Sequence, residues 1–325
     1  MSAEVRDVEL PEVEVRDLVD EDLPAVVRLW NGTHPHLVMQ TEERLRHIAL
    51  SVPPQARRVQ RVAVAGGQVV GYASARLNLE TSEPGQGHVT VVVDAGHRRR
   101  GIGGALLAGA QAHLLAAGAT TLHSRTGDEA GSAAFAQRHG FTVTRQERFQ
   151  RADLTVLETL SGVTDAPGPP DGVRVVPVTG LTAEAVHACD AAATLDMPGD
   201  VTFDAMDLDR WRADVWDAPG FDRALSHGAV DASGRVLALA LLETNPQRRA
   251  VWSGMTGTLR EARGLGLARL VKIAALRAAA AAGYTQAWTG NDDSNAAMRA
   301  VNTRLGYTVA VTGCGVLRRV RPTGA

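Results

Sequence analysis

Two short segments of the chain combine glycine with arginine in a pattern suited to binding phosphate. They are Arg98-Arg99-Arg100-Gly101-Ile102-Gly103 and Arg263-Gly264-Leu265-Gly266-Leu267-Ala268. Each stands between a predicted strand and a predicted helix. A helix start leaves backbone N–H groups without partners and carries partial positive charge, and small residues let a pyrophosphate approach that backbone. Arginine adds charge-assisted hydrogen bonds, so both segments are candidate phosphate turns.

The turn occurs twice because the chain contains a duplication. Glycines in matching sequence contexts stand 165, 165, 166 and 167 positions apart, at positions 101 and 266, 118 and 283, 140 and 306, and 67 and 234. The first pair opens an Ala- and Leu-rich helix and the second pair closes it. A nearly constant offset in the same order indicates two diverged copies of one domain of about 150 residues.

Three other interpretations of these turns compete with phosphate binding by a helix start. Glycines that only allow tight packing are the simplest, but two copies at equivalent positions argue against packing alone. A dinucleotide site needs a third glycine, where the first turn has Leu106, and an early N-terminal strand. A Walker phosphate loop needs Gly-Lys-Ser/Thr, which neither turn contains.

The hydrophobic pattern of one copy predicts an α/β domain. Expected strands lie at 13–18, 61–65, 69–77, 88–94, 120–124 and from 141 onward, and expected helices at 21–30, after Arg100 up to Gly118, and at 132–138. The strands are first mostly antiparallel and then form one strand–helix–strand unit. Residues 161–173 contain three prolines and three glycines without periodicity. We therefore place an N-terminal domain at 1–160, a linker at 161–172 and a C-terminal domain at 173–325.

With these motifs the chain resembles the Gcn5-related N-acetyltransferase (GNAT) family. In that family an R-x-x-G-x-G/A turn between a strand and a long helix holds the pyrophosphate of acetyl-CoA. The second half adds Asn295-x-x-Met298-x-x-x-Asn302-x-x-x-Gly306-Tyr307, similar to the family motif whose asparagine contacts the CoA arm. The resemblance covers both halves and implies two tandem GNAT domains, each a mixed, mostly antiparallel sheet flanked by helices.

The resemblance also implies acetyl-CoA as co-substrate and a set of residues that bind it. In the family, the strand before the turn splays from its neighbour and bonds the acyl-pantetheine arm through its backbone. The corresponding residues are Thr256, Thr258, Arg263, Gly264, Leu265, Gly266, Ala268 and Asn295 in the second half, and Val91, Val93, Arg98, Arg99, Arg100, Gly101, Gly103 and Gly104 in the first. Lys272, the only lysine, follows one helical turn further on and favours the second half.

The two halves differ where the cofactor arm and the general acid are expected. Opposite Asn295 the first half has Glu129, whose carboxylate would repel CoA phosphates, so we expect this half to be degenerate. Many family members carry a tyrosine acid four residues before the Gly-aromatic pair, where this chain has Ala136 and Asn302. A thiol with a pKa near ~8.5 leaves tolerably as thiolate, or a water held by Asn302 donates the proton. A structural cap or a CoA contact is the alternative role for Asn302.

Glu243 is the candidate base, because it ends a predicted strand close to Trp252. Asp196 and Asp200, in a loop where acceptors would bind, are further options. For each of the three, a solvated loop carboxylate is the simpler interpretation. His34-Pro35-His36 lacks a third ligand, so no metal is expected.

Composition narrows the function classes. With 34 basic and 36 acidic side chains the formal net charge is −2, which favours neither nucleic acid nor a membrane surface. The first residues lack the apolar run of a signal peptide, so a cytoplasmic protein is expected. The excess of Arg, Ala, Val and Gly indicates a GC-rich, bacterial coding sequence.

The resulting prediction is an acetyl-CoA-dependent N-acetyltransferase acting on a primary amine of a small molecule, with its active site in the second half. A non-catalytic acyl-CoA-binding or sensing protein is the main alternative. A nucleotide-dependent oxidoreductase is a weaker one.

Overall fold

The computed structural model describes residues 13–127 and 130–320. Glu129, expected to weaken the first cofactor site, lies outside these residues. The N-terminal half contains the following strands and helices in chain order: β1 (Val13–Asp17), α1 (Leu23–Thr33), α2 (Glu42–Ser51), β2 (Val59–Ala65), β3 (Gln68–Leu77), β4 (Gln86–Val93), α3 (Ile102–Ala116), β5 (Thr121–Gly127), α4 (Ala130–Arg138) and β6 (Thr142–Asp153).

The second half repeats this order after a linker helix. Its elements are α5 (Ser161–Thr164) in the linker, then β7 (Arg174–Pro177), α6 (Ala183–Thr194), α7 (Leu208–Trp211), β8 (His227–Val230), β9 (Val236–Asn245), β10 (Ala250–Thr258), α8 (Leu267–Ala281), β11 (Gln286–Asp292), α9 (Ala296–Arg304) and β12 (Thr308–Arg319). Gly101 and Gly266 both precede the long helix of their half, and Gly140 and Gly306 both follow its short helix. The duplication inferred from the offsets is therefore confirmed.

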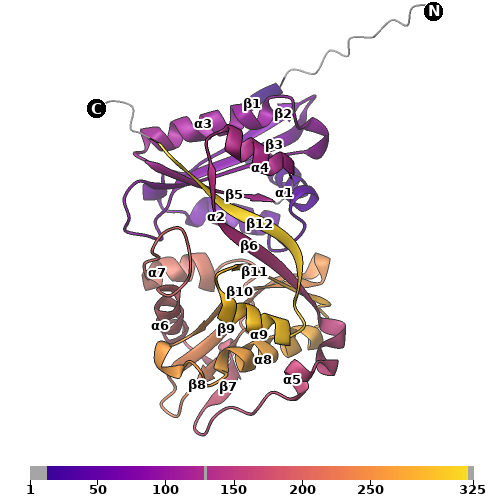
Figure 1. Cartoon of the computed structure of the whole chain (residues 1–325), viewed down its shortest axis with the longest axis vertical. Helices are drawn as coiled ribbons and strands as arrows, with labels where there is room; N and C mark the ends of the chain where they lie inside the picture. Colours follow the sequence, from indigo (N-terminus) through magenta and orange to yellow (C-terminus); the bar gives the residue numbers. More distant parts are fainter. Residues whose placement is uncertain (1–12, 128–129, 321–325) are drawn as a thin grey trace, which may run out of the picture.

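The strands form one sheet of twelve, in the order β1-β2-β3-β4-β5-β12-β6-β11-β10-β9-β8-β7. The last strands of the two halves are exchanged. β6 pairs with β11 of the second half, and β12 pairs with β5 of the first. In Figure 1, β6 and β12 cross the middle of the molecule side by side. The halves are thus two mixed, mostly antiparallel α/β units, as expected, joined edge to edge.

In each half two parallel strands touch only at their beginnings. β4 pairs with β5 from Gln86 to His88, and β10 pairs with β11 from Ala250 to Trp252. Beyond these points no further pairing joins the two strands within the described residues, so each pair opens toward the phosphate turn. We call these openings the N-terminal split and the C-terminal split.

The strand before the C-terminal split is bulged, and its counterpart is regular. The register of β10 on β9 shifts between Ser253 and Thr256, so that β10 has one residue more than its partner. β4 pairs with β3 without any shift. A bulge leaves a residue out of the ladder and turns the strand locally. It therefore frees backbone groups of β10 beside the split.

Apolar packing of α3 and α8 holds the sheet faces together. Leu106, Leu107 and Leu114 of α3 are buried against β2–β4, and Val271, Ala275 and Leu276 of α8 against β8–β10. Among the described residues, no helix is long and apolar enough to cross a membrane.

Candidate active site in the C-terminal half

The two phosphate turns have the same backbone conformation. φ is +64° at Arg99 and +80° at Gly264, and +83° at Gly101 and +75° at Gly266. The guanidinium of Arg98 donates to the carbonyl of Val93, and that of Arg263 donates to the carbonyl of Thr258, at 3.1 and 3.3 Å. Positive φ is easily adopted by glycine only, so Arg99 is strained where Gly264 is not. Both turns direct the start of a long helix toward the open end of a split.

Buried polar atoms without partners surround the C-terminal split. The hydroxyl oxygens of Thr256 and Tyr307 and the amide oxygen of Asn302 have no hydrogen-bond partner among the described residues. Thr256 lies on β10 just after the bulge, Asn302 on α9, and Tyr307 directly before β12. A buried polar group without a partner costs about 1–3 kcal/mol. Three of them around one split indicate that a ligand with hydrogen-bonding groups completes this site.

The N-terminal split has apolar residues at the matching positions. Thr256, Asn302 and Tyr307 correspond to Val91, Ala136 and Phe141 by the sequence offset. These three apolar side chains belong to one hydrophobic cluster or pack against it. At these three positions the N-terminal split therefore has no polar side chain, although Thr126 of β5 also has a buried hydroxyl without a partner.

Helix α4 also presses on the start of α3 in the N-terminal half. A Cβ atom added to Gly103 would lie 3.2 Å from the ring of Phe135, and one added to Gly104 would lie 3.9 Å from His139. In the C-terminal half the residue matching Phe135 is Val301, which is smaller, and Ala268 stands in place of Gly103. The ring of Phe135 therefore lies against the first turn of α3, beside the N-terminal phosphate turn.

Glu243 lies opposite Trp252 in the β9–β10 ladder. A Cβ atom added to Gly254, within the bulge, would lie 3.7 Å from the Glu243 carboxylate. This carboxylate forms an ion pair with Arg44 of α2, in the other half. Burial raises the pKa of Glu243, and Arg44 offsets part of that rise. The predicted base is thus beside the split, with a pKa above the usual carboxyl range, which suits a base that must hold a proton transiently.

Asn302 is part of a buried amide network. Its side-chain nitrogen donates to Asn291 at 2.7 Å and to Gln150 at 3.1 Å. Gln150 belongs to the exchanged strand β6, so the first half contributes to this site. Asn295 caps α9, because its side chain accepts a hydrogen bond from the backbone of Met298 at 3.2 Å.

The other two candidate bases are engaged in ion pairs. Asp196 accepts hydrogen bonds from Arg260, at 2.9 Å from its Nε, and from Arg263 of the phosphate turn. These arginines hold the pKa of Asp196 well below its usual range. Asp200 accepts from Arg145 at 3.0 Å. A carboxylate whose pKa is lowered, as that of Asp196 is, makes a poor base. Burial raises the pKa of Glu243 despite its own ion pair with Arg44, so Glu243 remains the candidate.

Aromatic residues of both halves gather on the face of the sheet that carries Glu243. Trp252 and Trp288 lie opposite each other at the last paired position of β10 and β11. Phe149 of β6 lies between His36 and Trp252, with ring centroids 4.2 and 6.5 Å away. His36 belongs to the loop after α1. The same loop contacts β9, because the side-chain nitrogen of Asn245 donates to the carbonyl of Val38 at 2.7 Å. The first half therefore supplies part of the wall beside Glu243.

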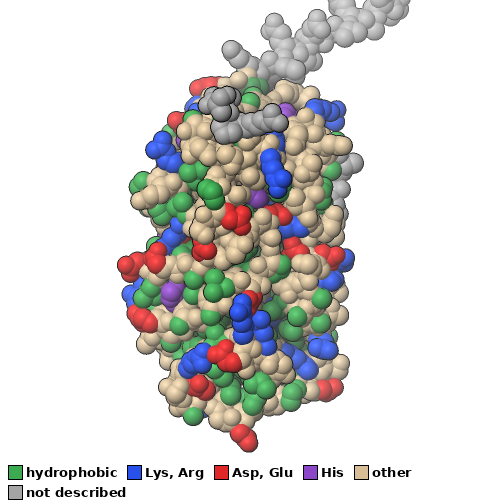
Figure 2. Space-filling model, turned by 60° about the vertical axis from the view of Figure 1, so that its left-hand side comes forward, with side chains coloured by type: hydrophobic (Ala, Val, Ile, Leu, Met, Phe, Trp, Pro, Cys, Tyr) green, Lys and Arg blue, Asp and Glu red, His purple; other side chains and the backbone are tan. Residues whose placement is uncertain are grey.

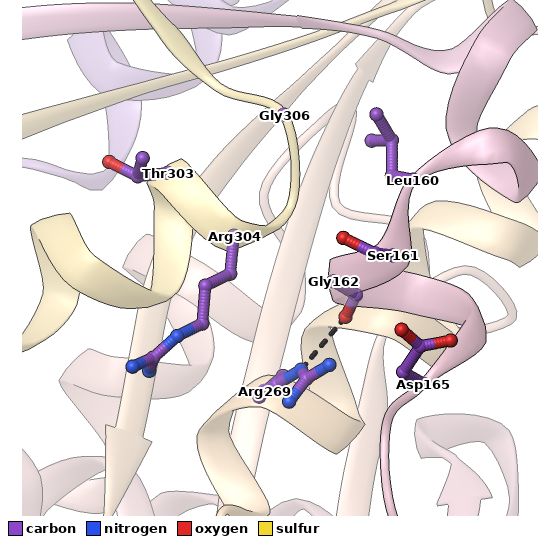
Figure 3. Close-up of a pocket in the computed structure, with 8 residues that line it drawn as sticks. All are labelled: Leu160, Ser161, Gly162, Asp165, Arg269, Thr303, Arg304 and Gly306. Atoms are coloured by element: carbon purple, nitrogen blue, oxygen red, sulfur yellow. Dashed lines mark hydrogen bonds between the residues drawn. The ribbon is translucent and has the colours of Figure 1, made fainter.

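A hollow of about 440 Å³ lies on the helix side of the C-terminal half (Figure 3). Its lining comes from the linker helix α5, the first turn of α8 and the end of α9. Arg269 donates to the carbonyl of Gly162 at 2.8 Å, across the hollow. Gly162 is closely packed, since an added Cβ would lie 1.6 Å from the carbonyl oxygen of Arg304. This contact fixes the linker against α9.

Acidic and basic side chains alternate over the surface drawn in Figure 2, and neither sign gathers into an extended patch there.

The sequence did not reveal two parts of this site. Arg44 lies 199 positions from Glu243, and only the fold brings the two together. Lys272 follows the phosphate turn by one helical turn, as the sequence showed, but the structure buries it, at 1% exposed, where it donates to the hydroxyl of Ser253 at 3.2 Å. The uniqueness of Lys272, within an otherwise apolar helix face, was the available signal.

Comparison with known proteins identifies the class. A model of the acetyltransferase (GNAT) family matches residues 23–141. The chain is 30% identical over 259 residues to a mycothiol acetyltransferase of Saccharomonospora viridis, covering 76% of this chain and 79% of that protein. It is also 30% identical over 250 residues to the mycothiol acetyltransferase of Thermobispora bispora, covering 75% and 78%. The chain therefore belongs to the GNAT family of N-acetyltransferases.

Within that family it has the tandem arrangement. A tandem GNAT protein from the clavulanic acid biosynthesis pathway superposes with a TM-score of 0.74 at 22% identity, over 96% of this chain and all of that one (100%). A GCN5-related N-acetyltransferase from Sphaerobacter thermophilus gives a TM-score of 0.71 at 20% identity, over 96% and 98%. The family model matches the first half, whereas the polar split lies in the second. Family membership alone therefore does not identify the working half.

Proposed function

We propose that the protein transfers the acetyl group of acetyl-CoA to a primary amine of a small molecule, in the C-terminal split. The observation that carries this proposal is the set of buried, unpartnered polar atoms of Thr256, Asn302 and Tyr307. They lie beside a bulged strand in the C-terminal half only. An acyl-pantetheine arm carries amide and carbonyl groups that would satisfy them.

The phosphate turn is suited to the other end of the cofactor. The backbone from Arg263 to Ala268 would bind the pyrophosphate at the start of α8, where unpaired N–H groups and the helix dipole favour anions. The hollow lined by Arg269 and Arg304 adjoins this end of α8. Its two guanidinium groups would favour a phosphorylated nucleotide. We extend the binding proposal to Thr258, Gly264, Leu265, Gly266 and Asn295.

The reaction needs a neutral amine and a polarised thioester. Glu243 would take the amine proton as nitrogen attacks the carbonyl carbon. Backbone N–H groups freed by the bulge between Ser253 and Thr256 would stabilise the charge that develops on the carbonyl oxygen. Arg44 holds Glu243 in place. Trp252 and Trp288 would form one side of the acceptor pocket.

The acceptor would be a small polar amine. The relatives at 30% identity are named mycothiol acetyltransferases, so the acceptor of this chain is proposed to belong to the same broad class of small metabolites. The loop after α1 and strand β6 place residues of the first half around Glu243. We therefore propose that the N-terminal half, 1–160, completes the acceptor site while the C-terminal half, 173–325, performs the reaction in the cytoplasm.

Release of free thiol from acetyl-CoA, measured with a panel of primary amines, tests this function. We expect amine-dependent thiol release, with the acetylated amine identified by mass spectrometry. Tight binding of acetyl-CoA without turnover on any amine would instead support an acyl-CoA-binding or sensing protein.

A further inference from the structure

A buried polar cluster lies under the bulge of β10, on the side of the sheet covered by α8. Lys272 Nζ donates to Ser253 Oγ at 3.2 Å and lies 5.0 Å from the centre of the Tyr307 ring. All three residues are at most 2% exposed. The Tyr307 hydroxyl makes no hydrogen bond of ordinary length and angle among the described residues, although the Ser253 hydroxyl lies near enough to offset part of the rise that burial causes in its pKa. The cluster is therefore closed to solvent and incompletely satisfied.

The cluster lies where β10 leaves β11. Ser253 is the first residue after the last β10–β11 pair and the last before the bulge. Side chains alternate along a strand, so Ser253 points away from the face that carries Trp252 and Glu243. Thr289 of the neighbouring strand β11 donates its hydroxyl to the backbone carbonyl of Ser253 at 2.9 Å. The cluster thus lies at the closed end of the C-terminal split.

The N-terminal half lacks this cluster entirely. By the sequence offset, Lys272 matches Leu107 and Tyr307 matches Phe141. Ser253 matches Val89, because each is the first residue after the last parallel pair of its half. Leu107, Val89 and Phe141 all belong to one apolar core. The same fold is therefore stable with apolar residues at these positions. A fully buried lysine is costly unless it is neutral or paired, so packing alone does not account for Lys272.

We propose that Lys272, acting through the hydroxyl of Ser253, supplies the proton that the CoA thiolate takes up as it leaves. This rests on the proposed function of the C-terminal half. It provides the acid that Ala136 and Asn302 do not provide. Lys272 is a positioning residue in this scheme, because Ser253 would make the contact with sulfur.

The proton balance closes over one turnover. The amine nitrogen forms a bond to the carbonyl carbon and gives its proton to Glu243. The C–S bond breaks and its electron pair stays on sulfur. The Ser253 hydroxyl gives its proton to sulfur and receives one from Lys272. Glu243 loses its proton to solvent and Lys272 regains one, so amine and acetyl-CoA yield amide and CoA thiol.

The surroundings of Lys272 suit this role. Burial lowers the pKa of Lys272 to about 7, close to the optimum for a general acid at neutral pH. Tyr307 is the titratable group in contact with it, and burial raises the pKa of that hydroxyl. Charged groups on neighbouring elements are engaged elsewhere: Arg269 with Gly162, Arg277 with Glu158, Arg299 with Asp293, Asp292 with Arg145, and Glu243 with Arg44 on the opposite face.

Because Lys272 is the only lysine, its protonation can be followed without turnover. Protein labelled with 13C-lysine gives one Cε signal to titrate. We expect a midpoint near pH 7, shifted when CoA thiol is added. A midpoint in the ordinary lysine range, ~10.4, would overturn the proposal. This readout remains valid even if no amine is acetylated, so it separates failure of this proposal from failure of the proposed function.

Kinetics of Lys272→Met provide the second test. We expect kcat at pH 6.5 to fall about 10- to 100-fold, with unchanged affinity for CoA by calorimetry. The decline of wild-type kcat above neutral pH should disappear in the variant. Leu107→Met, the matched change in the first half, should keep wild-type kcat and pH dependence.

Ser253→Ala removes only one oxygen atom, so it can test the proposal even if Lys272→Met does not fold. It should reproduce the loss of kcat, and the double variant should be no slower than either single one. A folded Lys272→Met or Ser253→Ala with wild-type kcat and pH profile would contradict the proposal. So would a variant that loses only CoA affinity, because Lys272 would then merely place the cofactor.

Discussion

The two strand splits share a backbone plan but differ in what lines them. In the C-terminal half, β10 is bulged and Thr256, Asn302 and Tyr307 present buried polar atoms without partners. In the N-terminal half, β4 is regular and Val91, Ala136 and Phe141 fill the same places with apolar groups. The polar lining on which the proposed site depends is therefore found at these positions in the C-terminal half and not at the matching positions of the N-terminal half. The first copy still contributes His36, Arg44 and Phe149 to the face beside Glu243.

A matched pair of variants in the two phosphate turns should give the largest difference between the halves. Gly266→Val should abolish turnover, because the side chain blocks the approach of phosphate to the backbone. Gly101→Val should keep most activity. Both glycines have positive φ and open space where a Cβ would stand, so both variants carry similar backbone strain. Thiol release is measured after folding is checked by circular dichroism. An inactive but folded Gly101→Val beside an active Gly266→Val would reverse the assignment of the halves.

Glu243→Gln should produce the next largest effect, a loss of about 10²- to 10⁴-fold at neutral pH. The pKa of Glu243 is raised by burial, so wild-type activity should rise with pH, up to neutral pH, as the carboxyl loses its proton. The variant should lack this rise below neutral pH, and from neutral pH to pH 9 its deficit relative to wild type should shrink, because more of the amine is then already neutral. Rates of thiol release by wild type and Glu243→Gln, measured across this pH range, test the role of Glu243 as base. An equal deficit at both pH values would exclude Glu243 as the base.

Asn302→Ala introduces the residue of the first half at this position. It leaves Gln150 and Asn291 without their donor, at a cost of about 1–3 kcal/mol. We expect kcat/KM for acetyl-CoA to fall about tenfold. The matched control Ala136→Gly should leave kcat/KM unchanged. Wild-type kinetics in a folded Asn302→Ala would show that the C-terminal split does not depend on its polar lining.

Asp196→Asn should have a smaller effect of opposite sign. Asp196 is bonded to Arg260 and Arg263 beside the phosphate turn, and removing its charge leaves both guanidinium groups available to phosphate. The affinity for acetyl-CoA should rise only about two- to fivefold, since solvent-exposed ion pairs are weak. Calorimetry at low and high salt measures this change. Weaker binding in the variant would mean that Asp196 orders the turn for the cofactor.

Gly162→Ala should change stability rather than activity. The new methyl group would meet the backbone of Arg304, so the linker helix must shift away from α9. We expect a lower melting temperature, with kcat at saturating acetyl-CoA within about twofold of wild type because the split is untouched. Gly168→Ala, in open space of the same linker, is the control. Equal melting temperatures for the two variants would contradict this packing.

The sequence predicted the features that depend on neighbouring residues along the chain. Alternating and helical apolar patterns predicted the strands and helices of the first half except α2, and the glycine spacing predicted the same order in the second half and the turns around Gly101 and Gly266. The exchange of β6 and β12 was not predictable, because strand partners in space are not encoded by the pattern along one strand. The same limit hid the pairing of Arg44 with Glu243. The burial of Lys272 depends on which face of α8 meets the sheet, and its position one helical turn after the phosphate turn does not reveal that.

A crystal structure of the protein soaked with acetyl-CoA tests the central claim most directly. We predict a thioester between β10 and β11, with its pantetheine arm bonded to the bulged strand and its carbonyl beside Glu243. The buried oxygens of Thr256, Asn302 and Tyr307 should then acquire partners from the ligand or from water ordered by it. A thioester bound only between β4 and β5, with the C-terminal split unchanged, would contradict the account.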